Sequence, residues 1–287
     1  MMEQALSVRG LRKQYDGFSL RDVSFDLPRG SIMGLIGENG AGKTTTISAI
    51  LGLIHPDAGQ VRILGKEIKA GERELHEKLG VVLDESNFHD NLTIRDIDAI
   101  MARMYRTWNR EIFYGYCKQF GLPERKTVKT FSRGMKTKLS IAVAISHDAE
   151  LLILDEATSG LDPVVRNEIL DIFLEFIQDE RKSILVSSHI TGDLEKVADY
   201  ITFLHGGKVL LSQNRDELLE RYGVLRCGLG DFGKLDPALV EGVRKNQFGY
   251  EVLVRDRRDA VRRYPNYSVD PASLEEIMVF YVRGKEA

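Results

Sequence analysis

The sequence has few cysteines, no long apolar run and no large excess of charge of either sign. Its two cysteines, Cys117 and Cys227, stand too far apart for a local metal motif, and such sparse use fits a reducing cytoplasm. No stretch reaches the roughly 18 consecutive apolar residues of a membrane span, and the N-terminal sequence MMEQALSVRG lacks the apolar segment of a signal peptide. We therefore expect a cytoplasmic protein that is held at a membrane only by a partner.

The charged residues are nearly balanced. Lys and Arg number 40 and Asp and Glu number 43, so the net charge is −3. A protein that coats nucleic acid is expected to carry a basic domain, and no nucleic acid is therefore expected as a partner. The length of 287 residues allows one large α/β domain and a smaller unit beside it.

The most specific motif follows a short apolar run, residues 32–36, which has the length of a buried strand. Residues 37–44 read GENGAGKT and match the phosphate-binding pattern G-x-x-x-x-G-K-[ST] at every position. The glycines allow the backbone to turn tightly around an anion, and residues 43–53 are predicted to form a helix whose positive end points at that anion. The alternative is a glycine-rich turn with a solvated lysine.

A nucleotide bound in this loop would use two side chains in particular. Lys43 is expected to reach the β- and γ-phosphates and to assist catalysis, and the Thr44 hydroxyl is expected to bind Mg²⁺. The predicted nucleotide-binding residues of the segment are Gly37, Glu38, Asn39, Gly40, Ala41, Gly42, Lys43, Thr44 and Thr45.

Two further predicted strands are followed by polar side chains. The apolar residues 151–154 precede Asp155 and Glu156, and residues 183–188 precede His189. Adjacent carboxylates at the end of a buried strand are unfavourable without a cation, and the Mg²⁺ of a nucleotide would supply one. Asp155 is expected to hold Mg²⁺ indirectly, and Glu156 to act as general base on the attacking water. Exposed acids in a loop are the alternative.

His189 is predicted to contact the γ-phosphate. Open α/β sheets bind their ligands at the carboxyl edge of the strands, and the phosphate loop, the acidic pair and this histidine all follow strands. A histidine bonded to a backbone carbonyl would be the plainer interpretation.

Ser132 is predicted to cap a helix whose first turns contain Arg133, Lys136 and Lys138 but no acid. Positive charge at a helix N-terminus opposes the helix dipole, which indicates either an anion bound there or a solvated basic face.

The remaining segments predict the surroundings of the site. Residues 5–28 alternate as antiparallel strands do, and Tyr15, before a turn, is either core or a platform for a nucleotide base. Helices are predicted at 93–106, from a Thr93/Asp96 capping box, and at 110–121, with many aromatic residues that form a local core or a docking surface. Gly206 and Gly207 predict a hairpin turn, and strands at 224–227 and 250–254 with a helix capped by Ser273 predict a small α+β unit.

Together these pieces resemble the ATP-binding subunit of an ABC transporter over about residues 5–215, in order as well as in kind. Residues 37–44 resemble the Walker A loop, 151–155 Walker B, Glu156 the catalytic glutamate, 159–162 the D-loop and His189 the switch histidine. Tyr15 matches the adenine-stacking aromatic. The resemblance implies an α/β fold: a P-loop NTPase core of the ABC ATPase type with an antiparallel β subdomain, a helical subdomain and a small C-terminal α+β extension.

The resemblance also implies domains, cofactors and partners. The ATP-binding domain would span 1–219, with the helical subdomain at about 85–150, and 220–287 would be a small accessory domain. The protein would bind ATP and Mg²⁺, hydrolyse ATP as a homodimer around two ATP molecules, and drive a separate transmembrane permease from the inner face of the membrane. Bacterial exporters of the antibiotic or peptide type are the most similar subclass, and substrate selectivity would lie in the permease.

Two positions depart from the family pattern. The signature, LSGGQ in the family, reads FSRGM here, so Ser132 and Gly134 are expected to contact the ATP of the second copy. Asp84 stands where the family has the Q-loop glutamine. A carboxylate there would bind Mg²⁺ directly and would repel a γ-phosphate, which would alter coupling to the permease.

Two other functions fit parts of the sequence. One is a soluble ABC-type ATPase acting on nucleic acid or ribosomes, but the chain has neither the long coiled-coil insertion nor the second cassette of those relatives. The other is a nucleotide-gated regulatory module with little turnover, which Asp84 and the altered signature would allow.

Overall fold

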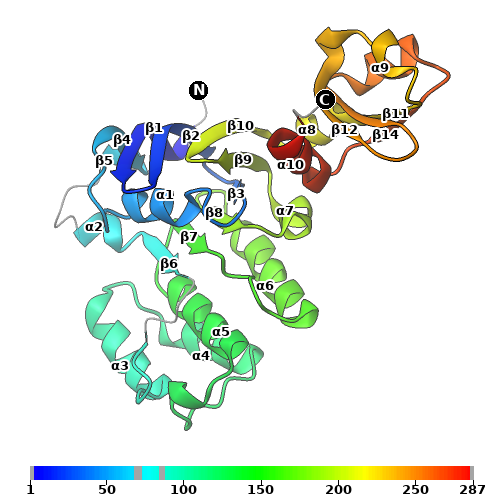
Figure 1. Ribbon diagram of the computed structural model, residues 1–287. Helices are drawn as coiled ribbons and strands as arrows, with labels where there is room; N and C mark the ends of the chain where they lie inside the picture. The colour runs from blue at the N-terminus through cyan, green and yellow to red at the C-terminus, as the bar shows by residue number, and fades with distance from the viewer. Residues whose placement is uncertain (1–2, 68–72, 84–87, 285–287) are drawn as a thin grey trace.

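The structure is a computed structural model that describes residues 3–67, 73–83 and 88–284. Its centre is a six-stranded sheet in the order β10-β9-β3-β8-β7-β6 (Figure 1). All neighbours in this sheet are parallel except β10 and β9. The strands are β3 (Ile32–Ile36), β6 (Leu79–Val82), β7 (Leu151–Asp155), β8 (Ser183–Ser188), β9 (Tyr200–His205) and β10 (Lys208–Asn214).

The central strands are buried on both faces, as continuous apolar runs require. Because successive side chains of a strand point to opposite faces, Ile32 and Ile36 enter one hydrophobic cluster whereas Met33 and Leu35 enter another. The first cluster lies against α5 (Arg133–Ile145), α6 (Pro163–Phe176) and α7 (Thr191–Val197). The second lies against α1 (Lys43–Ile50) and the N-terminal strands.

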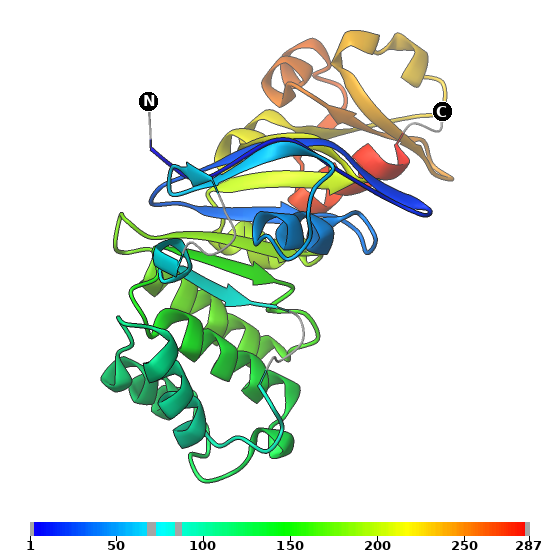
Figure 2. The same cartoon turned by 90° about the vertical axis from the view of Figure 1, so that its left-hand side faces the viewer.

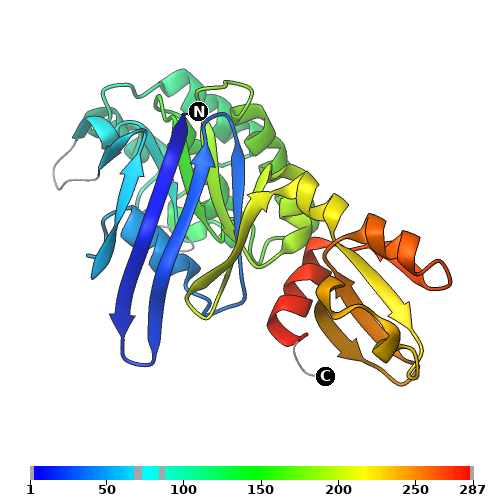
Figure 3. The same ribbon diagram turned by 90° about the horizontal axis from the view of Figure 1, so that it is seen from above.

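The N-terminal strands form an antiparallel sheet in the order β2-β1-β4-β5. They are β1 (Gln4–Tyr15), β2 (Phe18–Pro28), β4 (Ala58–Ile63) and β5 (Lys66–Glu67). Val23, Phe25 and Leu27 of β2 are buried, which confirms the predicted alternation. Figure 3 shows the two long strands β1 and β2 side by side.

Helices α3 (Ile94–Met104), α4 (Arg110–Gln119) and α5 follow β6 and precede β7 in the sequence. They lie together at the end of the molecule away from the C-terminal strands (Figure 2). Thr93 and Asp96 form the predicted capping box of α3. The aromatic residues of this part build a local core, because Phe113 and Phe120 are buried and Trp108 packs on Phe113. The docking-surface interpretation is therefore wrong for Phe113 and Phe120.

Helix α1 ends three residues before its predicted end, at Ile50. Gly52 adopts a φ of +68°, a left-handed conformation that favours glycine and stops helices, and the N–H of Leu53 turns back to the carbonyl of Ser48 at 2.9 Å. At the start of α6, Asp162 is the N-cap and Pro163 stands in the first turn.

The C-terminal residues form a third sheet in the order β12-β13-β11-β14. The strands at 224–227 and 250–254 are confirmed as β11 (Gly223–Cys227) and β13 (Tyr250–Val254). Other elements of this part were not predicted: α8 (Arg215–Arg221), β12 (Val240–Lys245), α9 (Arg257–Arg263) and β14 (Ser268–Pro271). The helix α2 (Arg73–His76), before β6, was also not predicted.

The last helix, α10 (Leu274–Arg283), begins at the predicted Ser273 cap and returns to the main body (Figure 3). Leu274 N–H donates to a carboxylate oxygen of Glu195 on α7 at 2.5 Å, and the Tyr281 ring meets Phe203 of β9 edge-on. Ile277 and Phe280 are buried in the same cluster as the central strands. The C-terminal part therefore shares a hydrophobic core with the central sheet.

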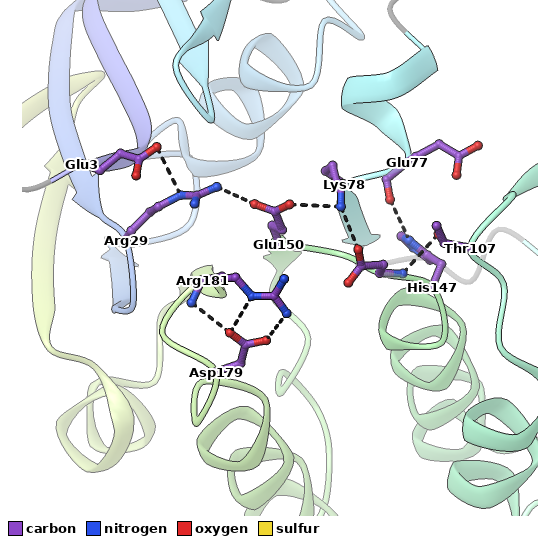
Figure 4. Close-up of polar contacts among 10 residues, drawn as sticks. Glu3, Arg29, Glu77, Lys78, Thr107, His147, Glu150, Asp179 and Arg181 are labelled. Carbon is purple, nitrogen blue, oxygen red and sulfur yellow. Dashed lines mark hydrogen bonds and ion pairs between the residues drawn. The ribbon is translucent and has the colours of Figure 1, made fainter.

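Charged side chains join the amino ends of the parallel strands (Figure 4). Glu150, just before β7, pairs with Arg29, just before β3, and lies 3.1 Å from Lys78, just before β6. Lys78 also pairs with Asp148 at 2.7 Å, which raises the pKa of Lys78 and lowers that of Asp148. Ion pairs thus connect the segments at the amino ends of these strands, whereas the predicted site lies at their carboxyl ends.

His147 beside this network is buried and stacks on Tyr105, with 4.0 Å between the ring centroids. Its Nδ1 donates to the carbonyl of Glu77 at 3.1 Å (Figure 4). Burial lowers the pKa of His147 below its ordinary value of 6.5. As the pH falls, His147 is therefore protonated at a higher pH in the unfolded chain than in the folded protein. The stability that depends on neutral His147 is complete above about pH 6.5 and is lost as the pH falls through the folded pKa.

The variant His147→Asn is expected to lower stability at neutral pH but to flatten its decline on acidification, by at most about 1.4 kcal/mol per pH unit. Urea unfolding of the wild type and the variant between about pH 7.5 and about pH 5.5 measures this difference. His55→Asn, at an exposed histidine, is the control. Equal pH slopes for wild type and His147→Asn would contradict the prediction.

Candidate functional site

The phosphate loop lies between β3 and α1, and its shape depends on glycine. A Cβ on Gly37 would come 2.4 Å from the carbonyl oxygen of Leu204, and a Cβ on Gly42 would come 2.7 Å from Phe18 Cζ. Gly42 also has a φ of +107°, which L side chains rarely adopt. Leu204 and Phe18 therefore pack against one side of the loop. An anion can approach only from the other side, where Glu38, Asn39 and Gly40 are exposed.

Helix α1 begins at the loop with no side-chain cap and no acid in its first turn. The first N–H groups of a helix have no partner within the helix, and together with the helix dipole they attract an anion. Thr44 is exposed and Thr45 is half-buried in this first turn. A hydroxyl at Thr44 is thus available beside any phosphate that the loop holds.

Lys43 is buried, and its ammonium group has three oxygen neighbours. Its Nζ donates to the carbonyls of Gly37 at 2.8 Å and Glu38 at 3.3 Å, and lies 3.1 Å from Oε1 of Glu156. That carboxylate oxygen is itself buried and accepts no hydrogen bond. Buried carboxylate oxygens normally accept a hydrogen bond. The free oxygen of Glu156, next to the Lys43 ammonium, therefore suits a site where a bound ligand donates the missing hydrogen bond.

The acidic pair stands at the carboxyl end of β7. Asp155 is buried, and Ser187 of the neighbouring β8 donates its hydroxyl to Asp155 at 2.5 Å. Glu156 has a φ of +51°, uncommon for a residue with a Cβ, and its N–H donates to both the carbonyl and the hydroxyl oxygen of Ser187, at 3.2 and 3.0 Å. Strained backbone of this kind persists where neighbouring contacts hold it, and here it turns Glu156 toward Lys43.

His189 follows β8 and meets the same carboxylate from the other side. Its Nδ1 lies 2.7 Å from Oε2 of Glu156, and its side chain is 40% exposed. The structure therefore brings Lys43, Glu156 and His189 together at one carboxyl edge, as expected from the sequence. The centre of the group is Glu156, which contacts both of the others.

The oxygen ligands expected of Mg²⁺ are partly in place. Asp155 and Thr44 belong to this edge, and the described ranges contain no group of three or more His, Cys, Asp or Glu side chains able to hold a metal alone. Mg²⁺ commonly binds through one or two protein oxygens together with waters and substrate phosphates, so these donors suit it. Asp84 lies outside the described residues.

Tyr15 lies at the end of β1, opposite Phe18 of β2, and Phe18 in turn contacts Gly42 of the loop. Its side chain is 41% exposed, and the Nζ of Lys13 lies 5.7 Å from its ring centroid. The interpretation of Tyr15 as a core residue is therefore wrong, because much of the residue is exposed to solvent.

Ser132 caps α5, and Gly134 lies in the first turn of this helix beside Leu161 and Val165. Ser132 is exposed and accepts from Met135 N–H at 3.2 Å. The nearby positive charges have acids from other elements: Lys136 lies 3.4 Å from Asp90, and Lys138 pairs with Glu168. These lysines by themselves therefore do not indicate a bound anion, which corrects part of the sequence-based reasoning.

Ser187 contacts both acids of the candidate site, and the sequence reasoning did not single it out. It supports both Asp155 and Glu156 through one hydroxyl group. The available signal was the pair of serines that ends the otherwise apolar strand SILVSS, because polar side chains inside a buried strand need specific partners.

Comparison with known proteins places these features in a family. Residues 20–159 match the ABC transporter family. Bacitracin transport ATP-binding protein BcrA of Enterococcus faecalis is 34% identical over 224 residues, 77% of this chain and 73% of that protein. Lantibiotic transport ATP-binding protein SrtF of Streptococcus pyogenes is 34% identical over 213 residues, 74% of this chain and 91% of that protein.

A solved structure of the ATP-binding subunit of an ABC transporter has the same fold, with a TM-score of 0.67 and 28% identity over 75% of this chain and 91% of its own. The expected α/β fold of the ABC ATPase type is thereby confirmed. The family match contains both the phosphate loop and the acidic strand end. On this similarity and this site, the chain belongs to the ABC transporter family as an ATP-binding, ATP-hydrolysing subunit.

Proposed function

We propose that the protein binds Mg²⁺ and ATP at the Lys43–Glu156–His189 group and works as a homodimer that drives export through a separate transmembrane permease. The contacts of Glu156 with both Lys43 and His189 are the observation that carries this proposal. A carboxylate between a cation and an imidazole, at the open face of a phosphate loop, is suited to polarising a water next to a γ-phosphate.

Each side chain has a role that follows from its position. Lys43 moves from its carbonyl partners to the β- and γ-phosphates, and Tyr15 stacks on the adenine. Glu156 accepts the proton of the attacking water, and His189 donates a hydrogen bond to the γ-phosphate. Thr44, Asp155 and Asp84 would hold Mg²⁺, which supplies charge neutralisation between the phosphates.

A second copy completes the site in this proposal. Exposed Ser132 and the backbone of Gly134, at the start of α5, would contact the γ-phosphate bound to the other copy. The ATP-binding domain would span 1–219, with the helical subdomain at about 85–150, and 220–287 would be an accessory domain.

The names of two relatives support a class of transported substrate. BcrA is named for transport of bacitracin, and SrtF for transport of a lantibiotic. We infer export of a peptide or antibiotic-like substrate, with this chain on the cytoplasmic face of the membrane beside its permease. No helix among residues 3–67, 73–83 and 88–284 has the length and apolar character to span a bilayer.

Phosphate release by the purified protein tests the proposal. Wild type is expected to release phosphate only with Mg²⁺, and Thr44→Val to need roughly tenfold more Mg²⁺ for half-maximal rate, because one oxygen ligand is lost. Thr137→Val, whose hydroxyl bonds only within α5, is the matched control. An unchanged Mg²⁺ dependence in Thr44→Val would contradict the role of Thr44, and no release by wild type would favour the regulatory alternative.

A further inference from the structure

A short turn connects the catalytic carboxylate to α6. Residues 159–162 follow Glu156 closely and end at Asp162, the cap of α6. On one side the turn touches the start of α5: a Cβ on Gly160 would come 2.6 Å from Nη1 of Arg133, and Leu161 lies near Gly134. The turn is therefore in contact with the segment proposed to close on the ATP of the second copy.

On its other side the turn is held by Arg166, one turn into α6. Arg166 Nη2 donates to the carbonyl oxygen of Leu161 at 3.1 Å. The Nε of the same guanidinium faces Oδ2 of Asp193 at 3.6 Å. One side chain thus reaches both the turn and α7.

Asp193 is an unusual residue to find buried. Its side chain is 5% exposed, and Oδ2 accepts no hydrogen bond, just as Nε of Arg166 finds no acceptor. A buried carboxylate without its cation is strongly unfavourable, so Asp193 depends on Arg166. The distance of 3.6 Å exceeds that of a hydrogen bond, and a small displacement of α7 would close it.

Asp193 lies in the first turn of α7, four residues after His189. Movement of α7 therefore moves the segment that carries the imidazole. Glu195, two residues after Asp193, attaches α7 to Leu274 of α10, so Arg166 and α10 contact this helix through different residues.

We propose that Arg166 is a positioning residue that links the 159–162 turn to the His189 segment, so that closure of the second copy on this turn sets the imidazole against Glu156 and the γ-phosphate. The inference deepens the proposed function and rests on it. Arg166 touches none of the reacting groups and acts through Leu161 and Asp193.

A second polar contact between the same helices supplies a matched control. Lys196 Nζ of α7 donates to Asn167 Oδ1 of α6 at 3.1 Å, one residue along from Arg166, but both side chains of this pair are largely in solvent. If α6 and α7 need only to be held together, loss of this contact and loss of the Arg166 contact should have similar effects.

The test measures kcat and KM for ATP by phosphate release, together with the thermal midpoint, for Arg166→Gln, Arg166→Lys, Asp193→Asn, the double variant Arg166→Gln/Asp193→Asn, and Asn167→Ala. Arg166→Gln is expected to lower kcat about tenfold and to leave KM within about twofold. Arg166→Lys should be intermediate, because an ammonium can pair with Asp193 but has no fork to reach Leu161 as well. Asn167→Ala should match wild type.

The double variant separates a shared contact from two independent roles. If Arg166 and Asp193 act through one contact, the double variant loses no more kcat than Arg166→Gln alone. Three results would each overturn the inference: a loss of kcat in the double variant equal to the product of the two single losses, an unchanged kcat in Arg166→Gln, or an equal loss of kcat in Asn167→Ala.

Should Arg166→Gln fail to fold, Asp193→Asn provides the same comparison with wild type. If the wild type released no phosphate, the proposed function itself would be wrong. If the wild type is active and the Arg166 variants have the same kcat, only the proposed role of Arg166 is wrong.

Discussion

Glu156→Gln is expected to slow ATP hydrolysis by about 10²- to 10³-fold while ATP still binds. The amide has the shape of the carboxylate but accepts no proton from water. The structure adds a second effect, because Oε1 of Glu156 lies 3.1 Å from Lys43 and competes with phosphate for that cation. Removing the negative charge should therefore tighten ATP binding. Single-turnover phosphate release and calorimetric titration with ATP measure the two effects.

The same variant reports on the dimer. ATP that is bound but not hydrolysed should hold two copies together, so light scattering is expected to show a dimer of Glu156→Gln with ATP and Mg²⁺. Glu168→Gln is the control, because Glu168 of α6 pairs with Lys138, away from the loop. A monomer under these conditions, or an affinity for ATP below that of wild type, would contradict the assigned contacts.

Lys43→Met is expected to weaken ATP binding by about a hundredfold or more, since charge-assisted hydrogen bonds to two phosphates are lost together. Met nearly preserves the volume of this buried side chain. The loss has a second cause: Glu156, only 13% exposed in its side chain, would face the phosphates without a cation between them. Calorimetric titration with ATP measures the affinity directly.

The double variant Lys43→Met/Glu156→Gln distinguishes the two causes. If repulsion by Glu156 contributes, the double variant should bind ATP more tightly than Lys43→Met alone, although neither hydrolyses it. Two contacting residues are expected to show such non-additivity. Equal affinities would mean that Lys43 acts only through its own bonds to phosphate.

Signals within a few residues predicted local structure well. The Thr93/Asp96 and Ser273/Glu276 capping boxes are both present, because a cap is satisfied by groups three residues away. The strand β12, with sequence VEGVRK, is polar and contains glycine, and it exists because it pairs with β13. Such pairing is a tertiary contact, and for this reason the sequence pattern did not indicate it.

The sequence by itself determined which chemistry the protein carries: a glycine loop with Lys43, an acidic pair after one strand and His189 after another, each visible as a residue type beside a short apolar run. Only the tertiary structure decided that Glu156 contacts both Lys43 and His189, that Ser187 supports it, and that Arg166 reaches Asp193. The order β3-β8-β7 makes these residues neighbours. That order depends on how whole faces of strands and helices pack against two hydrophobic clusters, a free energy to which residues far apart in the chain contribute together.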